Sequence, residues 1–233
     1  MFRGQGGAQP RKDEPEKPFW ISFSDMMTGL MALFLVAMAT AFVYVAQVSS
    51  KDQQRTQDIS QCMSQINVAS LAFPGIKVDK DAHLVDFGTR ATFAYDRSDL
   101  QPQQQELVRR FIPKVLQVAQ TPSCATWIKQ IVVDGFASKR GQYLYNMNLS
   151  FDRAERILCI LLANGGPGKH SLSAADREYV AEKFFPGGSS SNSLKETPEQ
   201  SQRIEIRIDF FNLKDPHPKP SPVDLATIGA CPI

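Results

Sequence analysis

The most uneven feature of the hydropathy pattern is an uncharged, mostly apolar run from Met26 to Ser50. As a helix with a rise of about 1.5 Å per residue, this run extends roughly 37 Å, enough to cross a hydrocarbon core of about 30 Å. Aromatic residues flank it, with Phe19 and Trp20 before it and Tyr44 near its far end, as is typical of interfacial belts. We therefore predict one transmembrane helix over residues 18–46.

A cleaved signal peptide is the competing interpretation of this run. The sequence Ala39-Thr40-Ala41 looks like a cleavage site, but it lies inside the apolar run rather than after it. The run is also longer than the hydrophobic part of a signal peptide, which is about 7–15 residues. Retention as a membrane anchor is therefore the interpretation that we favour.

The charges around the helix predict its orientation. Basic residues before it outnumber those close behind it, which favours a cytoplasmic N-terminus and an external, periplasmic C-terminal part. The residues counted are Arg3, Arg11, Lys12 and Lys17 before the helix, and Lys51 and Arg55 after it. The tail over residues 1–17 is rich in glycine, proline and mixed charge, so we expect it to be a disordered cytoplasmic segment.

Asp25 lies directly before the uncharged run. Spacings of three and four residues place it on one helix face with small residues, and such a face allows other helices to approach closely. The members of this face are Ser22, Asp25, Gly29, Ala32 and Val36. Two interpretations remain open: Asp25 caps the helix together with Ser24, or it is an intramembrane carboxylate that carries protons, since buried membrane acids mark ion pathways.

The remainder of the chain reads as a polar linker, a globular domain and a tail, over residues 47–74, 75–213 and 214–233. Within the domain the pattern predicts strands near 76–79, 84–94, 128–135 and 202–210, and helices near 101–119, 145–163 and 172–184. We expect the segment 186–201, which is rich in serine and glycine, to be a flexible loop. Strands that alternate with helices indicate an α+β domain whose helices cover one face of a sheet.

Composition and motifs exclude several classes of function. The formal net charge is +2, without a clustered basic face for nucleic acid. His83, His170 and His217 are scattered, and the chain has no hydrolase, nucleotide-binding or zinc-protease motif. We therefore expect neither an enzyme nor a bound metal or cofactor.

The four cysteines carry a prediction about compartment and pairing. Their spacing does not match a zinc site, and their even number suits disulfides in an oxidising compartment, although buried thiols in a cytosolic protein are the alternative. Cys124 precedes a strand and Cys159 lies late in the following helix, so both reach the same end of the domain. We predict a Cys124–Cys159 disulfide.

The linker carries an apolar stripe at alternating steps of three and four residues. If two chains lie side by side, the stripe forms a short parallel coiled coil and Cys62 faces its mate in an interchain disulfide. A short amphipathic helix on its own domain, or an intrachain Cys62–Cys231 bond, are the alternatives. The stripe consists of Ile59, Cys62, Ile66, Ala69 and Phe73.

The segment over residues 135–154, GFASKRGQYLYNMNLSFDRA, resembles the signature of OmpA-like peptidoglycan-binding domains. The resemblance implies a βαβαβ domain that binds the wall through Tyr145, Asn146, Leu149 and Arg153, with the arginine holding the carboxylate of a diaminopimelate stem peptide. The alternatives are a helix cap for Asn146 and a surface ion pair for Arg153. One position departs from the family: the aspartate that would contact the ammonium group of the peptide is Ser138 here.

The segment KPFWISFSDMMTGLMALFLV, residues 17–36, resembles the helix of stator B-type subunits, which include flagellar and Zorya defence members. The resemblance, closest to the Zorya type, implies that Asp25 is the proton carrier of a motor in the bacterial inner membrane. It further implies a homodimer inside a pentameric membrane subunit, with the external domain pinned to peptidoglycan. A flagellar stator subunit and a passive wall anchor without an ion path remain the alternatives.

Overall fold

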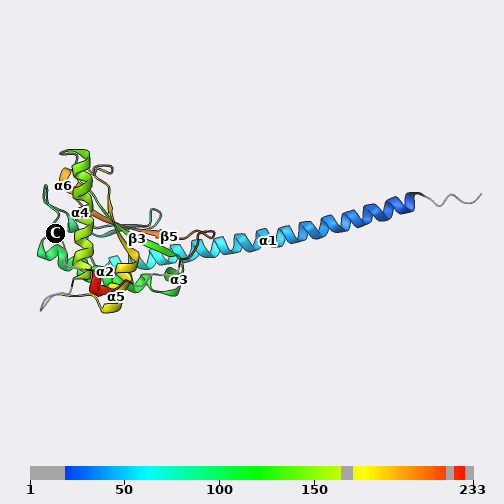
Figure 1. Ribbon diagram of the computed structural model, residues 1–233, viewed down its shortest axis with the longest axis horizontal. Helices are drawn as coiled ribbons and strands as arrows, with labels where there is room; N and C mark the ends of the chain where they lie inside the picture. Colours follow the sequence, from blue (N-terminus) through cyan, green and yellow to red (C-terminus); the bar gives the residue numbers. More distant parts are fainter. Residues whose placement is uncertain (1–18, 164–169, 219–222, 229–233) are drawn as a thin grey trace, which may run out of the picture. The chain divides into compact units, whose positions relative to one another are not determined.

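The computed structural model describes residues 19–163, 170–218 and 223–228 of the chain (Figure 1). The predicted cytoplasmic tail, residues 1–17, and Cys231 lie outside the described residues. The chain divides into two compact units, Met1–Ser50 and Lys51–Ile233.

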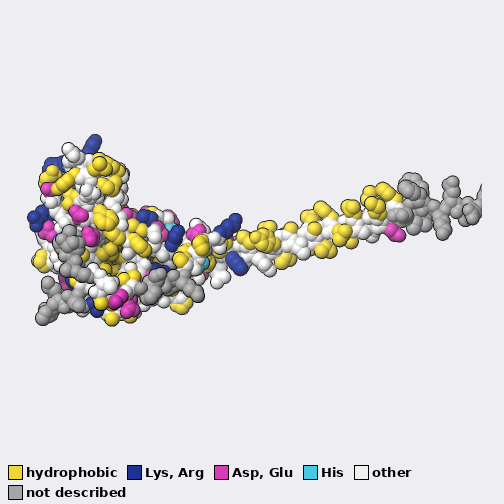
Figure 2. Space-filling model, viewed as in Figure 1, with side chains coloured by type: hydrophobic (Ala, Val, Ile, Leu, Met, Phe, Trp, Pro, Cys, Tyr) yellow, Lys and Arg dark blue, Asp and Glu magenta, His cyan; other side chains and the backbone are white. Residues whose placement is uncertain are grey.

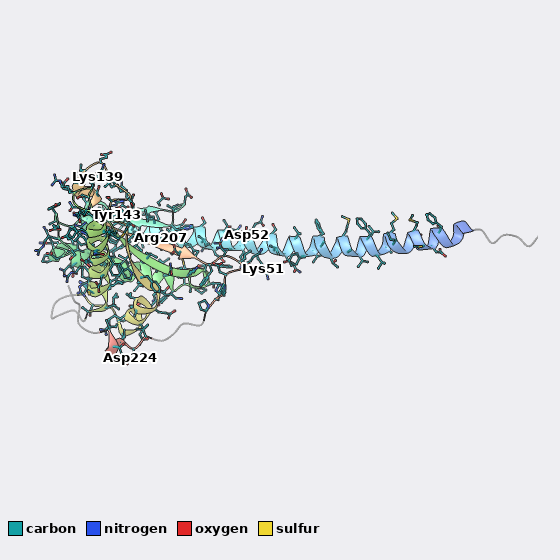
Figure 3. All side chains as sticks on the ribbon, turned by 45° about the horizontal axis from the view of Figure 1, so that its top comes forward. Lys51, Asp52, Lys139, Tyr143, Arg207 and Asp224 are labelled. Atoms are coloured by element: carbon teal, nitrogen blue, oxygen red, sulfur yellow. A yellow bond between two sulfur atoms is a disulfide. The ribbon has the colours of Figure 1, made fainter. Side chains whose placement is uncertain are left out.

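The helix α1, Phe19–Ser70, begins in the first unit. Its residues 23–50 are exposed, and Figure 2 shows that hydrophobic side chains cover much of this stretch. By length and composition α1 can cross a membrane, and it is the one such helix among the described residues. Charged side chains resume at Lys51 and Asp52, which are labelled in Figure 3. The prediction of a single N-terminal apolar helix is confirmed, although the helix continues well beyond the predicted end at residue 46.

The second unit is built on a five-stranded sheet with the strand order β1-β2-β5-β3-β4. The central strand β5 is antiparallel to both β2 and β3, whereas β3 and β4 are parallel. A parallel pair needs a crossover connection, which the helices between β3 and β4 supply. The strands are β1 Lys77–Asp79, β2 Leu84–Asp86, β3 Ile128–Gly135, β4 Phe184–Gly188 and β5 Ile204–Phe210.

Helices cover one face of this sheet, and the other face carries mostly polar side chains together with Val132 and Phe185. Alternate residues of β3, Ile131 and Val133, join the core formed with the helices. On the opposite face Arg207 pairs with Asp134 at 3.3 Å and with Asp209 at 2.6 Å. The helical segments are η1 Gly88–Ala91, α2 Pro102–Ala119, α3 Pro122–Ala125, α4 Tyr143–Leu162, α5 Ala174–Lys183, α6 Pro198–Ser201 and η2 Leu225–Thr227. The predicted α+β class is confirmed.

The segment predicted as a linker, residues 47–74, is instead largely helical and contributes to the core. Cys62, Met63 and Ile66 are fully buried in the core cluster, and Phe73 packs edge-to-face on Phe111 at 5.2 Å. Within the second unit this end of α1 is also held by hydrogen bonds, from Arg55 Nε to Phe211 O at 2.7 Å and from Trp127 Nε1 to Asp58 Oδ2 at 3.0 Å. The alternative of an amphipathic helix packed on its own domain therefore describes this segment.

The predicted Cys124–Cys159 disulfide is wrong. Cys124 is bonded to Cys62, with a Cα–Cα distance of 5.4 Å. The prediction failed because it left out α1: the buried stripe of this helix brings Cys62 beside α3, which carries Cys124. Cys159 is also disulfide-bonded, but not to Cys124. The interchain use of Cys62 is overturned as well, since its sulfur is already bonded within the chain.

Two other predicted elements differ from the structure. The strand predicted over residues 84–94 ends at Asp86 and is followed by η1. The segment 186–201, expected to be a flexible loop, contains the end of β4 and all of α6. Just after β4 the segment is anchored, because Ser190 is fully buried and its Oγ donates to Tyr143 O at 3.1 Å.

Candidate functional site

The segment 135–154, which carries the predicted wall-binding motif, lies around a small hollow at the N-terminal end of α4. We call this hollow the α4 hollow. Its walls are the loop after β3, the first turns of α4 and the loop that follows Phe93. Its volume is about 20 Å³, which is about the room that one water molecule needs. A small group such as an ammonium can enter it, whereas a larger ligand must lie across its rim. Its lining residues include Tyr95, Asp96, Ser138, Arg140, Tyr145, Asn146, Leu149 and Arg153.

All four residues predicted to bind peptidoglycan line this hollow, but they differ in how free their side chains are. Arg153 is fully buried and Asn146 nearly so, whereas the ring of Tyr145 is half exposed. Leu149 is partly buried. The structure thus brings the four together and divides them into two inner groups and two outer ones.

The guanidinium of Arg153 mainly links two loops, the one after Phe93 and the one after β3, through hydrogen bonds. It donates to three backbone carbonyl oxygens, those of Arg97 at 2.9 Å, Phe136 at 2.6 Å and Ala94 at 3.2 Å. Burial lowers the pKa of Arg153 to about 10, although the nearby Asp96 carboxylate opposes that shift, so the group remains charged at neutral pH. Most of its donors are therefore engaged by the protein itself, which the predicted role as a carboxylate-holding arm did not anticipate.

Asn146 shapes the loop between β3 and α4. Its amide nitrogen donates to Ser138 O at 3.1 Å and to Arg140 O at 2.9 Å, so both hydrogens are used. The loop turns back at Gly141, which has a φ of 94°, a conformation that favours glycine. The alternative of a helix cap for Asn146 does not hold, because the N-cap of α4 is Gln142.

Gly135 and Ser150 of the motif also have structural roles. A Cβ at Gly135 would collide with the backbone oxygen of Ser150, so β3 and α4 approach closely only with glycine there. Ser150 is buried, and its Oγ donates to Asn146 O at 2.7 Å. Much of the signature therefore builds the loop and the strand–helix contact rather than the rim of the hollow.

The rim of the hollow also carries aromatic and charged residues beside Tyr145. Three of them, Tyr95, Asp96 and Arg140, were not singled out from the sequence. Tyr145 donates its hydroxyl hydrogen to Asp96 Oδ1 at 2.6 Å, and this hydrogen bond is the main reason that the pKa of Tyr145 is raised. Across the rim the Arg140 guanidinium lies 5.8 Å from the ring centre of Tyr95. Figure 3 shows Lys139 near the start of α4, where Tyr143 is labelled. Tyr95 and Asp96 lie in the connection between the predicted strand 84–94 and the predicted helix 101–119. This position was the one indication in the sequence that they belong to the site.

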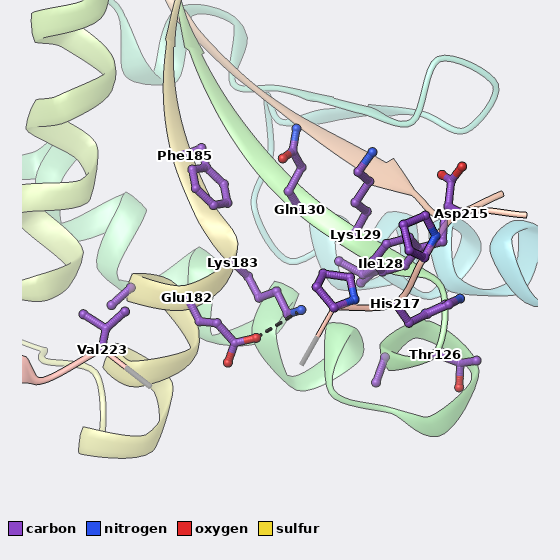
Figure 4. A pocket seen from close by; sticks show the side chains of 15 residues that line it. Thr126, Ile128, Lys129, Gln130, Glu182, Lys183, Phe185, Asp215, His217 and Val223 are labelled. Carbon is purple, nitrogen blue, oxygen red and sulfur yellow. Dashed lines mark ion pairs between the residues drawn. The ribbon is translucent and has the colours of Figure 1, made fainter. Parts of the chain in front are cut away.

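A second, larger pocket of about 780 Å³ lies elsewhere in the second unit (Figure 4). It is lined by the start of β3, the end of α5, Phe185 of β4 and residues near His217. Glu182 and Lys183 pair at 3.1 Å on its wall. Among the described residues no group of three or more histidine, cysteine or acidic side chains could hold a metal ion.

In the first unit, Asp25 lies in the second turn of α1, which begins at Phe19. A helix cap must stand at the first residue or before it, so the capping interpretation does not fit. Asp25 and its helical neighbours are exposed, and nothing lies within 4 Å of the space that a Cβ on Gly29 would occupy. The face shared by Asp25 and Gly29 is therefore open to another helix.

Comparison with known proteins identifies the family. The chain is 36% identical over 234 residues to the Zorya protein ZorB of Escherichia coli O139:H28, covering 98% of this chain and 95% of that protein. This chain belongs to the ZorB family. A second ZorB, from Escherichia coli strain Crooks, is 24% identical over 225 residues, covering 87% of this ZorB-family chain and 92% of the relative. No family model matches the chain.

Several solved structures are similar to this ZorB-family chain. The cell wall anchor of the T6SS from Pseudomonas aeruginosa has 16% identity and a TM-score of 0.41, covering 64% of this chain and 97% of that one. A putative MotB like protein from Desulfovibrio vulgaris has 14% identity and a TM-score of 0.40, covering 68% and 96%. The OmpA-like domain of FopA1 from Francisella tularensis has 16% identity and a TM-score of 0.37, covering 59% and 82%.

Proposed function

We propose that this ZorB-family chain is the wall-anchored B subunit of a proton-driven, stator-like motor of the inner membrane that serves Zorya-type antiviral defence. The observation that carries the proposal is the 36% identity to a ZorB protein over 98% of the chain, which includes both α1 and the domain. A single polypeptide thus joins a helix, whose apolar part follows directly after Asp25, to a domain with a small polar hollow. We assign these two parts to ion transfer and to anchoring, and no enzymatic step to either.

Asp25 is the proton carrier in this proposal. It lies at the start of an uncharged stretch that ends at Ser50, so its carboxylate has no basic partner on the following helix surface. A charge that crosses the membrane releases about 2.3 kcal/mol per 100 mV, so several protons drive one large conformational step. Protonation from one side neutralises Asp25, permits a step, and is followed by release to the other side.

The proton path is completed by other chains. The Asp25 side chain is exposed on the single chain, and a charged group in contact with lipid is costly. Polar groups of a pentameric membrane subunit, packed against the small-residue face at Gly29 and Ala32, supply the remaining path. Two copies of this chain form the inner dimer, with their N-termini in the cytoplasm and their domains in the periplasm.

The α4 hollow is the wall-binding site in this proposal. Tyr145 and Leu149 contact the stem peptide of peptidoglycan at the rim, while Asn146 and Arg153 hold the loops that form it. Attachment to the wall keeps the B dimer stationary while the surrounding subunits turn. The α1 segment from Lys51 to Ser70, which contributes Cys62, Met63 and Ile66 to the core, connects the anchored domain to the membrane helix.

The test replaces Asp25 with asparagine in the complete operon. Asp25→Asn keeps the size of the side chain but cannot cycle a proton, so we expect normal membrane levels and phage plating equal to that of cells without the operon. Asp25→Glu retains partial protection. Asp52→Asn is the matched control, because Asp52 is an exposed acid just beyond the other end of the uncharged run.

Full protection by the Asp25→Asn variant would contradict the proton-carrier role and leave a passive wall anchor. A flagellar role is tested separately, by whether deletion of the gene changes swimming rather than phage plating. Proton flux into cells that express the operon provides the direct measurement, with wild type and the Asp25→Asn variant compared at equal membrane levels.

A further inference from the structure

The chemistry of the α4 hollow differs at one point from what stem-peptide binding requires. A diaminopimelate side chain ends in both an ammonium and a carboxylate, so its recognition needs an acid as well as donors for the carboxylate. Position 138 carries a serine, which is 4% exposed and has no charge. The acid must therefore come from another element.

We propose that Asp96, in the loop after Phe93, supplies the carboxylate that receives the free amino group of the stem peptide. This inference rests on the proposed wall-anchoring function and names a recognition residue for it. Among the described residues that line the hollow, Asp96 is the one acid. The hollow of about 20 Å³ matches a group the size of water or ammonium rather than a sugar ring.

The Asp96 carboxylate is held in place by its neighbours. Oδ1 accepts the hydroxyl hydrogen of Tyr145 at 2.6 Å. Arg153 binds the backbone oxygens on either side of Asp96, those of Ala94 and Arg97. The φ of Asp96 is 60°, a left-handed conformation that aspartate tolerates better than most residues. One guanidinium thus fixes the loop on which the acid sits.

One oxygen of Asp96 is available to a ligand. The hydrogen bond from Tyr145 uses Oδ1, and Oδ2 has no hydrogen bond or ion pair with any other residue that the structure describes. Asp96 is also exposed, so an incoming group reaches it from solvent. Since Arg140 lies on the same rim, the hollow offers a negative and a positive group to a zwitterion.

The experiment combines a variant with a modified ligand. Purified sacculi of the diaminopimelate type are used either untreated or with their free amino groups acetylated by acetic anhydride. The full-length chain in detergent is sedimented with each, as wild type, Asp96→Asn and Asp99→Asn. Asparagine keeps the acceptor for Tyr145, and Asp99 is the control because it is an exposed acid on the same loop, paired with Arg97 at 2.9 Å.

We expect Asp96→Asn to bind untreated sacculi about tenfold more weakly, the usual loss for a hydrogen bond to a charged group. Acetylation should weaken wild type and the Asp99→Asn variant by a similar factor, and should leave the Asp96→Asn variant unchanged. Equal binding by wild type and Asp96→Asn, or an undiminished effect of acetylation on Asp96→Asn, would overturn the role of Asp96. Absence of wild-type sedimentation would overturn wall anchoring itself.

Discussion

At the scale of single residues, the side chains of the segment 135–154 have two different roles: some hold the loops in place, and others form the rim of the α4 hollow. The sequence placed Tyr145, Asn146, Leu149 and Arg153 at one site, and all four line the α4 hollow. It did not reveal that the Arg153 guanidinium donates its hydrogen bonds to backbone oxygens, because those oxygens belong to two loops that are far apart in the chain. A sequence pattern shows which residue types are present, whereas the partners of a buried donor depend on the completed fold.

The first prediction concerns Arg153. Replacement by alanine removes the Arg153 donor from the buried or partly buried backbone oxygens of Arg97 and Phe136, and leaves Ala94 O with only the Arg97 N–H as a donor. Since an unsatisfied buried polar group costs about 1–3 kcal/mol, Arg153→Ala should lower the unfolding free energy of the second unit by roughly 3 kcal/mol or more. Thermal unfolding followed by circular dichroism of the full chain measures this loss as a lower Tm.

The matched control for this prediction is Arg140→Ala. Arg140 lines the same hollow, but its side chain is exposed, so its removal should change stability by less than about 0.5 kcal/mol. If Arg153→Ala unfolds at the same temperature as wild type, the bracing role is wrong and the arginine is instead free for a ligand. Loss of wall binding by Arg153→Ala is therefore interpretable only beside its Tm.

At the scale of elements, the sequence predicted most of the sheet and the long helices but misassigned what joins them. β3 matches its predicted range, and α2 begins within one residue of the prediction. β4 was missed because FFPGG contains a proline and two glycines, residues that are poor strand formers and are tolerated at an edge. The stripe at Ile59, Cys62 and Ile66 was seen, but periodicity identifies an apolar face and not the surface that covers it.

The second prediction concerns the disulfide between α1 and α3. Cys62 and Cys124 are 62 residues apart, and closing a loop of that size is worth about 4 kcal/mol in the chain-entropy model. We therefore expect Cys62→Ser, or reduction of the wild type, to lower the stability of the second unit markedly. Peptide mapping without reductant should recover a Cys62–Cys124 peptide pair.

A non-reducing gel provides the complementary observation. Because the Cys62 sulfur is used within the chain, freshly extracted protein should migrate as a monomer, even if two copies associate without a covalent bond. A dimer band that disappears in Cys62→Ser would show instead that the cysteine joins two chains. The same gel with thiols blocked before lysis excludes exchange during extraction.

At the scale of the whole molecule, the proposed ion site and wall site lie in separate compact units of one chain. Asp25 belongs to the first unit, and the residues that line the α4 hollow belong to the second. The family relationship extends over both, since the similarity to ZorB covers 98% of the chain. The proposed motor role needs both parts, and each lies within its own unit.

The last prediction is that the two sites fail independently. Tyr145→Ala removes a half-exposed ring from the rim of the hollow, so we expect sedimentation with sacculi and phage protection both to be lost while Tm is retained. Asp25→Asn should lose protection but sediment like wild type, because the second unit is unchanged. Tyr143→Ala is the matched control, since Tyr143 is a half-exposed tyrosine of the same helical turn that does not line the hollow. Protection by a chain that no longer sediments would show that the wall attachment is dispensable, and the two units would then have to be explained without an anchored stator.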